Sequence, residues 1–232
     1  MDLKLKEWDD SYANKDNFVF YPHEEVIRFT SKYIRKRVGF DAFVDTHCGQ
    51  STPKVLDLGC GIGRHVKYLH ECGLETYGID LSGVAIETAR DIFARQGLTC
   101  LNERLYRASI TKMPFADDFF DFVVSHGVLD SMTFAIARDA MKETARCLKP
   151  GALFYLDLVS GDDREHYPEF CAEEIVETAH EKGTIQSYFN WGKILELAGS
   201  EWTIREAFLI RKTSLTSPAF HSRYHIVLEN RG

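Results

Sequence analysis

The stretch Val55-Leu56-Asp57-Leu58-Gly59-Cys60-Gly61-Ile62-Gly63-Arg64-His65 decides the fold. An apolar run ends in an acidic residue, a turn with glycine at alternate positions follows, and a helix-like segment then runs to Gly73. This pattern predicts a strand, a tight turn and a helix, with a turn whose bare backbone lets a ligand approach closely. Because N–H groups at a helix N-terminus attract anionic groups, we expect a nucleotide-like small molecule to bind at the end of this first core strand.

The spacing of the glycines narrows the choice of nucleotide. A dinucleotide fingerprint reads G-x-G-x-x-G, and here Gly59 and Gly61 take the first two places while Arg64 stands at the third. Asp57, directly before the turn, would repel a pyrophosphate and attract an ammonium group. S-adenosylmethionine (SAM) carries an amino acid, a sulfonium and an adenosine but no phosphate, so it fits the pattern better than a dinucleotide.

Further motifs follow this turn in a recognisable order. Residues 77–82 read as a strand that ends in an acid, residues 113–125 as an acidic turn leading into a strand, and residues 148–153 as the turn into the next strand. Together with residues 57–63, they resemble the class I SAM-dependent methyltransferases over about residues 50 to 160. The resemblance implies a methyltransferase enzyme with SAM as its cofactor.

The resemblance also implies where the cofactor lies. Its contacts are expected in the glycine turn and at the ends of the predicted strands: Asp57, Gly59, Cys60, Gly61, Asp80, Leu81, Ser109, Ile110 and Ser125. Asp57 would hold the ammonium directly or through water, and Asp80, about 20 residues past the glycines, both ribose hydroxyls. Ser109 stands where family members often carry an acid beside the adenine, so it offers a hydroxyl but no charge, and adenine contacts would lean on the backbone of Ile110.

Alternating strands and helices predict one doubly wound α/β domain over residues 1–232. By resemblance the sheet is Rossmann-like, seven-stranded and mostly parallel, with helices on both faces and an antiparallel last strand at residues 223–228. A helix is predicted over residues 22–37, within an N-terminal lid formed by residues 1–40. Residues 161–189 break the alternation and read as a hairpin insertion that caps the substrate.

The composition of the whole chain limits its partners. The net charge of −7 disfavours nucleic acid, and no apolar stretch reaches the length of a membrane span. The six cysteines are scattered without a C-x-x-C pair, which favours reduced thiols, a cytoplasmic protein and no metal site. We expect a monomer or a homodimer that acts on a small molecule.

Two residues after the fourth predicted strand are candidate catalysts. His126 has an ordinary pKa near 6.5 that suits a general base, with a loop cap or packing against the sugar of SAM as the alternative. Asp130 is the second candidate, with a helix cap or a solvated loop carboxylate as the alternative. Alignment of the reactants supplies about 7–11 kcal/mol, and a base only about 3–5 kcal/mol, so we expect positioning to dominate.

Aromatic residues near the predicted strand ends are candidates for the acceptor pocket, with packing of the lid as the alternative: Tyr12, Tyr21, Tyr188, Phe189 and Trp191. The segment 125–128 lacks the Asn/Asp-Pro-Pro-aromatic motif that nucleic-acid base methyltransferases carry at this place. The predicted function is therefore methyl transfer from SAM to an O, N or S nucleophile of a small molecule. A protein methyltransferase, a non-catalytic SAM-binding subunit and a dinucleotide-dependent oxidoreductase are the alternatives.

Overall fold

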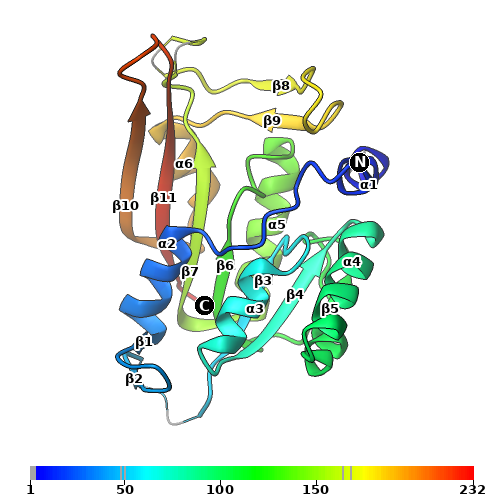
Figure 1. Ribbon diagram of the computed structural model, residues 1–232. Helices are drawn as coiled ribbons and strands as arrows, with labels where there is room; N and C mark the ends of the chain where they lie inside the picture. Colours follow the sequence, from blue (N-terminus) through cyan, green and yellow to red (C-terminus); the bar gives the residue numbers. More distant parts are fainter. Residues whose placement is uncertain (1–3, 48, 50, 164, 168) are drawn as a thin grey trace.

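A seven-stranded sheet forms the centre of the computed structural model, which describes residues 4–47, 49, 51–163, 165–167 and 169–232 (Figure 1). The strands lie in the order β10-β11-β7-β6-β3-β4-β5. Their bounds are β3 Lys54–Leu58, β4 Glu75–Asp80, β5 Leu105–Arg107, β6 Phe120–Ser125, β7 Leu148–Val159, β10 Trp202–Thr213 and β11 Phe220–Asn230. The last strand, β11, runs antiparallel to both of its neighbours, β7 and β10, so the predicted fold class is confirmed.

Helices cover both faces of this sheet. They are α2 Glu24–Phe29, α3 Arg64–Glu71, α4 Gly83–Arg95, α5 Phe134–Cys147 and α6 Trp191–Ala198. Within β3, Val55 packs with residues of α2 and α3, whereas Leu56 and Leu58 pack with residues of α5 and α6. The apolar run of β3 is therefore continuous because both of its faces are buried. Ser82 caps α4, since its hydroxyl accepts a hydrogen bond from the Ala85 N–H.

The predicted helix over residues 22–37 is wrong in its second half. After α2 the chain makes a π-helical turn, Thr30–Ile34, and then a short strand, β1 Arg35–Arg37, pairs antiparallel with β2 Phe43–Asp45. The Arg35 guanidinium donates to the Gly73 carbonyl at 3.0 Å and pairs with Asp45. These long-range contacts hold the basic run in an extended conformation, which a helix-like sequence pattern does not reveal.

Two segments lie over the carboxyl ends of the central strands. They are the N-terminal helix α1, Leu5–Ala13, and a hairpin formed by β8 Glu173–Ile175 and β9 Ile185–Ser187 (Figure 1). The Asp9 carboxylate accepts a hydrogen bond from the Ser82 hydroxyl at 2.5 Å, which ties α1 to the start of α4. The hairpin is as predicted. The lid and substrate-cap roles remain predictions, and residues 1–3, 164 and 168 of these segments lie outside the described residues.

Within the described ranges, no helix combines the length and the apolar composition that crossing a membrane requires.

Candidate active site

The glycine turn between β3 and α3 leaves no room for side chains. Gly59 and Gly61 both have positive φ, at 73° and 54°, a conformation that residues with a Cβ rarely adopt. A Cβ at Gly59 would lie 2.5 Å from a methyl carbon of Val128, and one at Gly61 would lie 2.6 Å from the Tyr12 hydroxyl. The turn is thus a backbone cradle held between the loop after β6 and helix α1.

Asp80 ties this turn to the neighbouring helix. Its Oδ2 accepts a hydrogen bond from the Gly61 N–H at 2.8 Å, and its Oδ1 accepts one from the Ser82 N–H at 2.9 Å. Burial raises the pKa of Asp80 to about 6, although both hydrogen bonds favour the charged form. Each carboxylate oxygen can accept a second hydrogen bond, so Asp80 retains capacity for two hydroxyl donors from a ligand.

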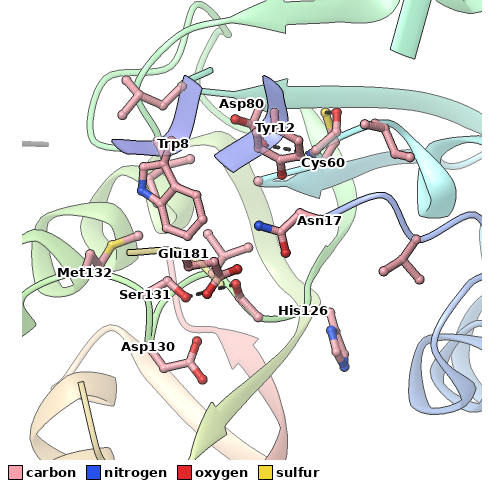
Figure 2. A pocket seen from close by; sticks show the side chains of 18 of the residues that line it. Trp8, Tyr12, Asn17, Cys60, Asp80, His126, Asp130, Ser131, Met132 and Glu181 are labelled. Carbon is pink, nitrogen blue, oxygen red and sulfur yellow. Dashed lines mark hydrogen bonds between the residues drawn. The ribbon is translucent and has the colours of Figure 1, made fainter. Parts of the chain in front are cut away.

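A cavity of about 370 Å³ opens above the turn, between the strand ends, α1 and the β8–β9 hairpin (Figure 2). Ten of the predicted site residues line it: Tyr12, Gly59, Cys60, Gly61, Asp80, Leu81, Ser109, Ile110, His126 and Asp130. The structure therefore brings the glycine turn, the predicted ribose and adenine residues and both candidate catalysts to one cavity. In Figure 2, Asp80 and Cys60 stand at one end of the cavity, and Asp130 with Ser131 at the other.

Two predicted cofactor residues lie behind the wall instead. Asp57 is 1% exposed and Ser125 is 2% exposed, and neither lines the cavity. The His65 Nε2 accepts a hydrogen bond from the His23 N–H, so the proton of a neutral His65 ring is on Nδ1, 3.5 Å from the Asp57 Oδ1. Because β3 and β6 are buried on both faces, the Asp57 carboxyl group lies beneath the turn and does not itself touch the cavity.

Of the five predicted aromatic residues, only Tyr12 lines the cavity. Tyr188 packs against His166 and Phe170, and Phe189 is fully buried in the core. Tyr21 and Trp191 are 83% and 42% exposed and lie away from it. Packing therefore accounts for Tyr188 and Phe189, because an aromatic side chain suits a core as well as a pocket.

Other lining residues come from segments far apart in the chain and were not predicted as site residues: Trp8, Asn17, Val19, Ser131, Met132, Ile136, His180, Glu181, Gln186 and Arg223. The Glu181 N–H donates to the Asp16 carboxylate at 3.4 Å, which joins the hairpin tip to the segment after α1. No local motif marks these residues. Arg223 in particular sits in the middle of an antiparallel strand, where sequence patterns give no sign of a site.

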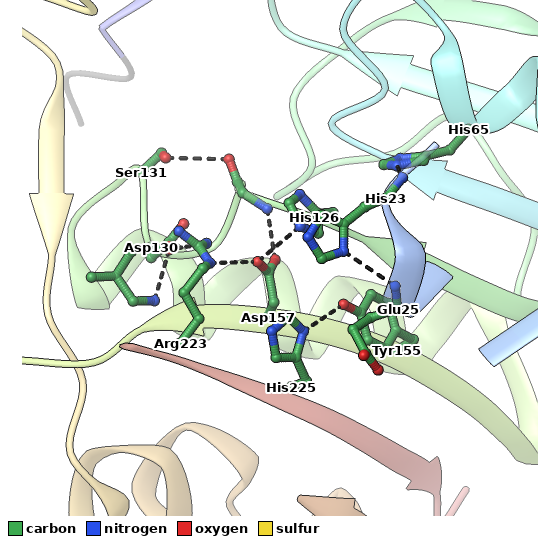
Figure 3. Close-up of polar contacts among 12 residues, drawn as sticks. His23, Glu25, His65, His126, Asp130, Ser131, Tyr155, Asp157, Arg223 and His225 are labelled. Carbon is green, nitrogen blue, oxygen red and sulfur yellow. Dashed lines mark hydrogen bonds and ion pairs between the residues drawn. The ribbon is translucent and has the colours of Figure 1, made fainter. Parts of the chain in front are cut away.

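Arg223 organises two buried carboxylates, Asp130 and Asp157, at the end of the cavity away from Asp80 (Figure 3). Its guanidinium lies 2.6 Å from the Asp130 Oδ2 and 2.7 Å from the Asp157 Oδ2. Each carboxylate also accepts one backbone N–H, from Val159 for Asp130 and from Gly127 for Asp157. Burial raises the pKa of Asp130 despite Arg223. Burial also opposes ionisation of Asp157, but Arg223 and His126 outweigh it and its pKa is lowered.

Both ring nitrogens of His126 lie near charged side chains, although only Nδ1 makes a hydrogen bond among the described residues. Its Nδ1 lies 3.2 Å from an Arg64 guanidinium nitrogen, and its Nε2 lies 3.3 Å from the Asp157 Oδ2. A guanidinium only donates hydrogen bonds, so Nδ1 accepts and the proton of the neutral ring is on Nε2, facing Asp157. Burial lowers the pKa of His126 to about 3, against the pull of Asp157. The ring is therefore neutral near pH 7.

Comparison with known proteins identifies the region that carries this site. Residues 56–156 match the family model described as a methyltransferase domain. A sterol 4-C-methyltransferase of Caenorhabditis elegans is 29% identical over 65% of this chain, and the methyltransferase GfsG of Streptomyces halstedii is 28% identical over 77%. The aligned part of the chain spans only 46% and 63% of these two relatives, respectively.

The fold is shared with solved structures. A SAM-dependent methyltransferase of Methanosarcina mazei superposes with a TM-score of 0.64 at 22% sequence identity, covering 78% of this chain and 94% of that one. At this identity the likeness is one of fold. It places the carboxyl ends of β3 and β4 where folds of this type bind their ligands.

Proposed function

We propose that the chain is a class I SAM-dependent methyltransferase and that it transfers the methyl group of SAM to an O, N or S nucleophile of a small molecule. The arrangement of Asp80 carries this proposal. Its buried carboxylate holds the glycine turn by the Gly61 N–H and still offers acceptor capacity to the cavity. A cradle that a Cβ would fill, beside a carboxylate suited to hydroxyl groups, fits SAM.

Each part of SAM has proposed partners. The backbone of Gly59, Cys60 and Gly61 would hold its amino acid portion, with Asp57 supplying charge for the ammonium from below. Asp80 and Leu81 would hold the ribose. Ser109 and Ile110 would hold the adenine. The Ser109 hydroxyl lies 2.8 Å from that of Thr111, which orients it.

When bound, SAM supplies an electrophilic methyl group on a cationic sulfur. The chain's own task is to exclude water and to align the acceptor, which supplies about 7–11 kcal/mol of the barrier in well-oriented reactions. His126 and Asp130 are the proposed sources of a general base, and both line the cavity. The Nδ1 of His126 accepts from Arg64, which favours a role in holding the Arg64 guanidinium, and we propose that this guanidinium binds the carboxylate of SAM.

Related proteins support a small acceptor. A rice protein named as a probable tocopherol O-methyltransferase is 30% identical over 62% of this chain, which corresponds to 41% of its own length. The negative charge of the chain agrees with a small acceptor better than with a nucleic acid.

The described cysteines are all unpaired, which supports the proposal of a cytoplasmic protein.

Titration calorimetry with SAM, S-adenosylhomocysteine and NAD tests the cofactor assignment. We expect both sulfur ligands to bind and NAD not to bind, whereas tighter binding of NAD would overturn the proposal. A metabolite screen that reads S-adenosylhomocysteine release then tests the activity. Release with peptides alone would favour a protein methyltransferase, and SAM binding without release in any screen would favour a non-catalytic subunit.

A further inference from the structure

We infer that Asp130 binds the methyl acceptor through its Oδ1, and that the acceptor is therefore an uncharged or cationic molecule with an O–H or N–H group at the reacting atom. The inference rests on the proposed methyl transfer and narrows its substrate class. It excludes carboxylate and phosphate acceptors, and it disfavours thiols and carbon nucleophiles.

The two carboxylate oxygens of Asp130 differ in their hydrogen bonding. The Oδ2 accepts hydrogen bonds from the Arg223 guanidinium at 2.6 Å and from the Val159 N–H at 2.8 Å. Its Oδ1 is buried and has no hydrogen-bond partner within the part of the chain that the structure describes. Asp130 nevertheless lines the cavity (Figure 2). An unmade hydrogen bond at a buried carboxylate oxygen is unfavourable, and a donor on a bound molecule would satisfy it.

The backbone around Asp130 is also held in place. Its carbonyl accepts hydrogen bonds from the Ser187 N–H at 2.7 Å and from the Gln186 side chain at 3.0 Å. With Oδ2 fixed by Arg223, the carboxylate has little freedom to turn its free oxygen elsewhere. Asp130 thus holds a preorganised oxygen that can accept a hydrogen bond, between the sheet and the β8–β9 hairpin.

Neighbouring polar groups are less suited than Asp130 to accept a hydrogen bond from a molecule in the cavity. The Asp157 carboxylate accepts a hydrogen bond from the Gly127 N–H on Oδ1 and one from the Arg223 guanidinium on Oδ2. The two nitrogens of His126 face Arg64 and Asp157. The oxygens of Asp57 are also unpartnered, but Asp57 does not line the cavity. The His126 Nε2 also lacks a hydrogen-bond partner, but it carries the proton of the neutral ring and can only donate. Among the described residues of this cluster that line the cavity, the Asp130 Oδ1 is therefore the unpartnered oxygen that can accept a hydrogen bond from the methyl acceptor.

The charge around the cavity selects against anions. Carboxylates outnumber guanidinium groups on its walls and directly beneath it: Asp57, Asp80, Asp130, Asp157 and Glu181 against Arg64 and Arg223. Burial keeps His126 and His23 neutral by lowering their pKa values to about 3 and about 4. The carboxylates near Asp130 would repel an anionic group on the methyl acceptor, because few water molecules screen the charges there. They would not repel a hydroxyl group or an amine.

The same oxygen gives the acceptor's proton a destination. The lone pair of the acceptor atom takes the methyl group, the sulfur keeps the electrons of the broken carbon–sulfur bond, and the proton passes to the Asp130 Oδ1. A thiol is a weak hydrogen-bond donor, and a C–H group weaker still, so neither would be held well by this oxygen.

Matched probes test the inference without knowledge of the natural acceptor. Phenol and anisole, and benzyl alcohol and benzyl methyl ether, differ only by the methyl group that replaces the O–H proton, and benzoate supplies an anion. Ligand-observed NMR would measure their affinities with and without S-adenosylhomocysteine. We expect wild-type protein to bind each hydroxyl compound at least tenfold more tightly than its methyl ether, and to bind benzoate most weakly.

Asp130→Asn should reduce that preference to less than threefold while S-adenosylhomocysteine binds within twofold of wild type. Asp139→Asn, an exposed acid on α5, serves as the matched control and should change neither value. Equal binding of the paired probes by wild type, benzoate binding as tight as phenol, or an unchanged preference in a folded Asp130→Asn variant would overturn the inference. Absence of S-adenosylhomocysteine binding would instead overturn the proposed function, because the probes are also measured without it.

Discussion

The two ends of one cavity are built in different ways. The proposed cofactor end consists mainly of backbone from a single turn, Gly59 to Gly63, with Asp80 fixed to it by the adjacent parallel strand. The proposed acceptor end consists of side chains from the loop after β6, from β11, from the N-terminal segment and from the hairpin. A backbone cradle is determined by a short stretch of sequence and adopts one geometry. A side-chain cluster depends on contacts between distant segments, and substitutions can change the functional groups that it offers. This difference lets one family of folds hold one cofactor and many acceptors.

The largest predicted effect is the loss of stability when Arg223 is removed from the acceptor end. Arg223→Met would leave Asp130 and Asp157 buried without their shared partner, and we expect a loss of about 3–5 kcal/mol in the free energy of unfolding. Urea denaturation measures this value. Restoring part of the loss by adding Asp157→Asn to Arg223→Met would show that the unpaired charge is the cause. A loss below about 1 kcal/mol, the scale of an exposed pair, would mean that the ion pairs contribute little.

At the cofactor end, the comparison can be sharpened with two glycines of the same backbone conformation. Gly59 and Gly97 have φ of 73° and 74°, but a Cβ would clash with Val128 only at Gly59, since nothing lies within 4 Å at Gly97. We expect Gly97→Ala to cost about 1 kcal/mol of unfolding free energy from backbone strain alone. Gly59→Ala should cost about 2–4 kcal/mol, because overpacking adds to that strain, and should abolish SAM binding.

Denaturation and calorimetry on both alanine variants separate the two effects. Equal losses of stability would show that the loop after β6 yields to the new methyl group, and that the cradle is less rigid than its contacts suggest.

The carboxylate of Asp80 tests the cofactor end through its side chain. Asp80→Ala removes the acceptor for the proposed ribose hydroxyls, and we expect SAM affinity to weaken by about 1–3 kcal/mol, the scale for a hydrogen bond to a charged group. Calorimetry gives the value, and Asp139→Asn is again a suitable surface control. Unchanged affinity in a folded Asp80→Ala variant would contradict the ribose assignment.

Sequence reasoning succeeded where structure is local. The glycine turn, the acid at the end of β4 and the Ser82 cap follow from short-range rules, and a continuous apolar run marks a strand buried on both faces. It could not reveal the Arg223 cluster, since Arg223 is separated from Asp130 by 93 residues and from Asp157 by 66. It also missed β1, where Arg35 binds carbonyls from another part of the chain.

The smallest predicted effect is a pH dependence of the cofactor end. Burial raises the pKa of Asp80 to about 6, so this carboxylate loses its proton between about pH 5 and pH 7. If the ionised form binds the ribose, the fraction in that form sets an affinity gain of about tenfold, or about 1.4 kcal/mol, over this range. The buried rings of His23 and His126 titrate below it, with pKa values of about 4 and about 3, and the ligand's amino group, near about 8, titrates above it.

The stability of the unliganded protein should respond to Asp80 in the opposite direction. Because the folded pKa lies above the unfolded value of 3.8, the folded chain binds the extra proton between about pH 4 and pH 6, and the contribution of this group to stability falls as pH rises through that range. Asp80→Asn should remove both trends, so subtracting its profiles from those of wild type isolates them. A flat wild-type affinity from about pH 5 to pH 7 would show that SAM binding does not require the ionised Asp80 carboxylate.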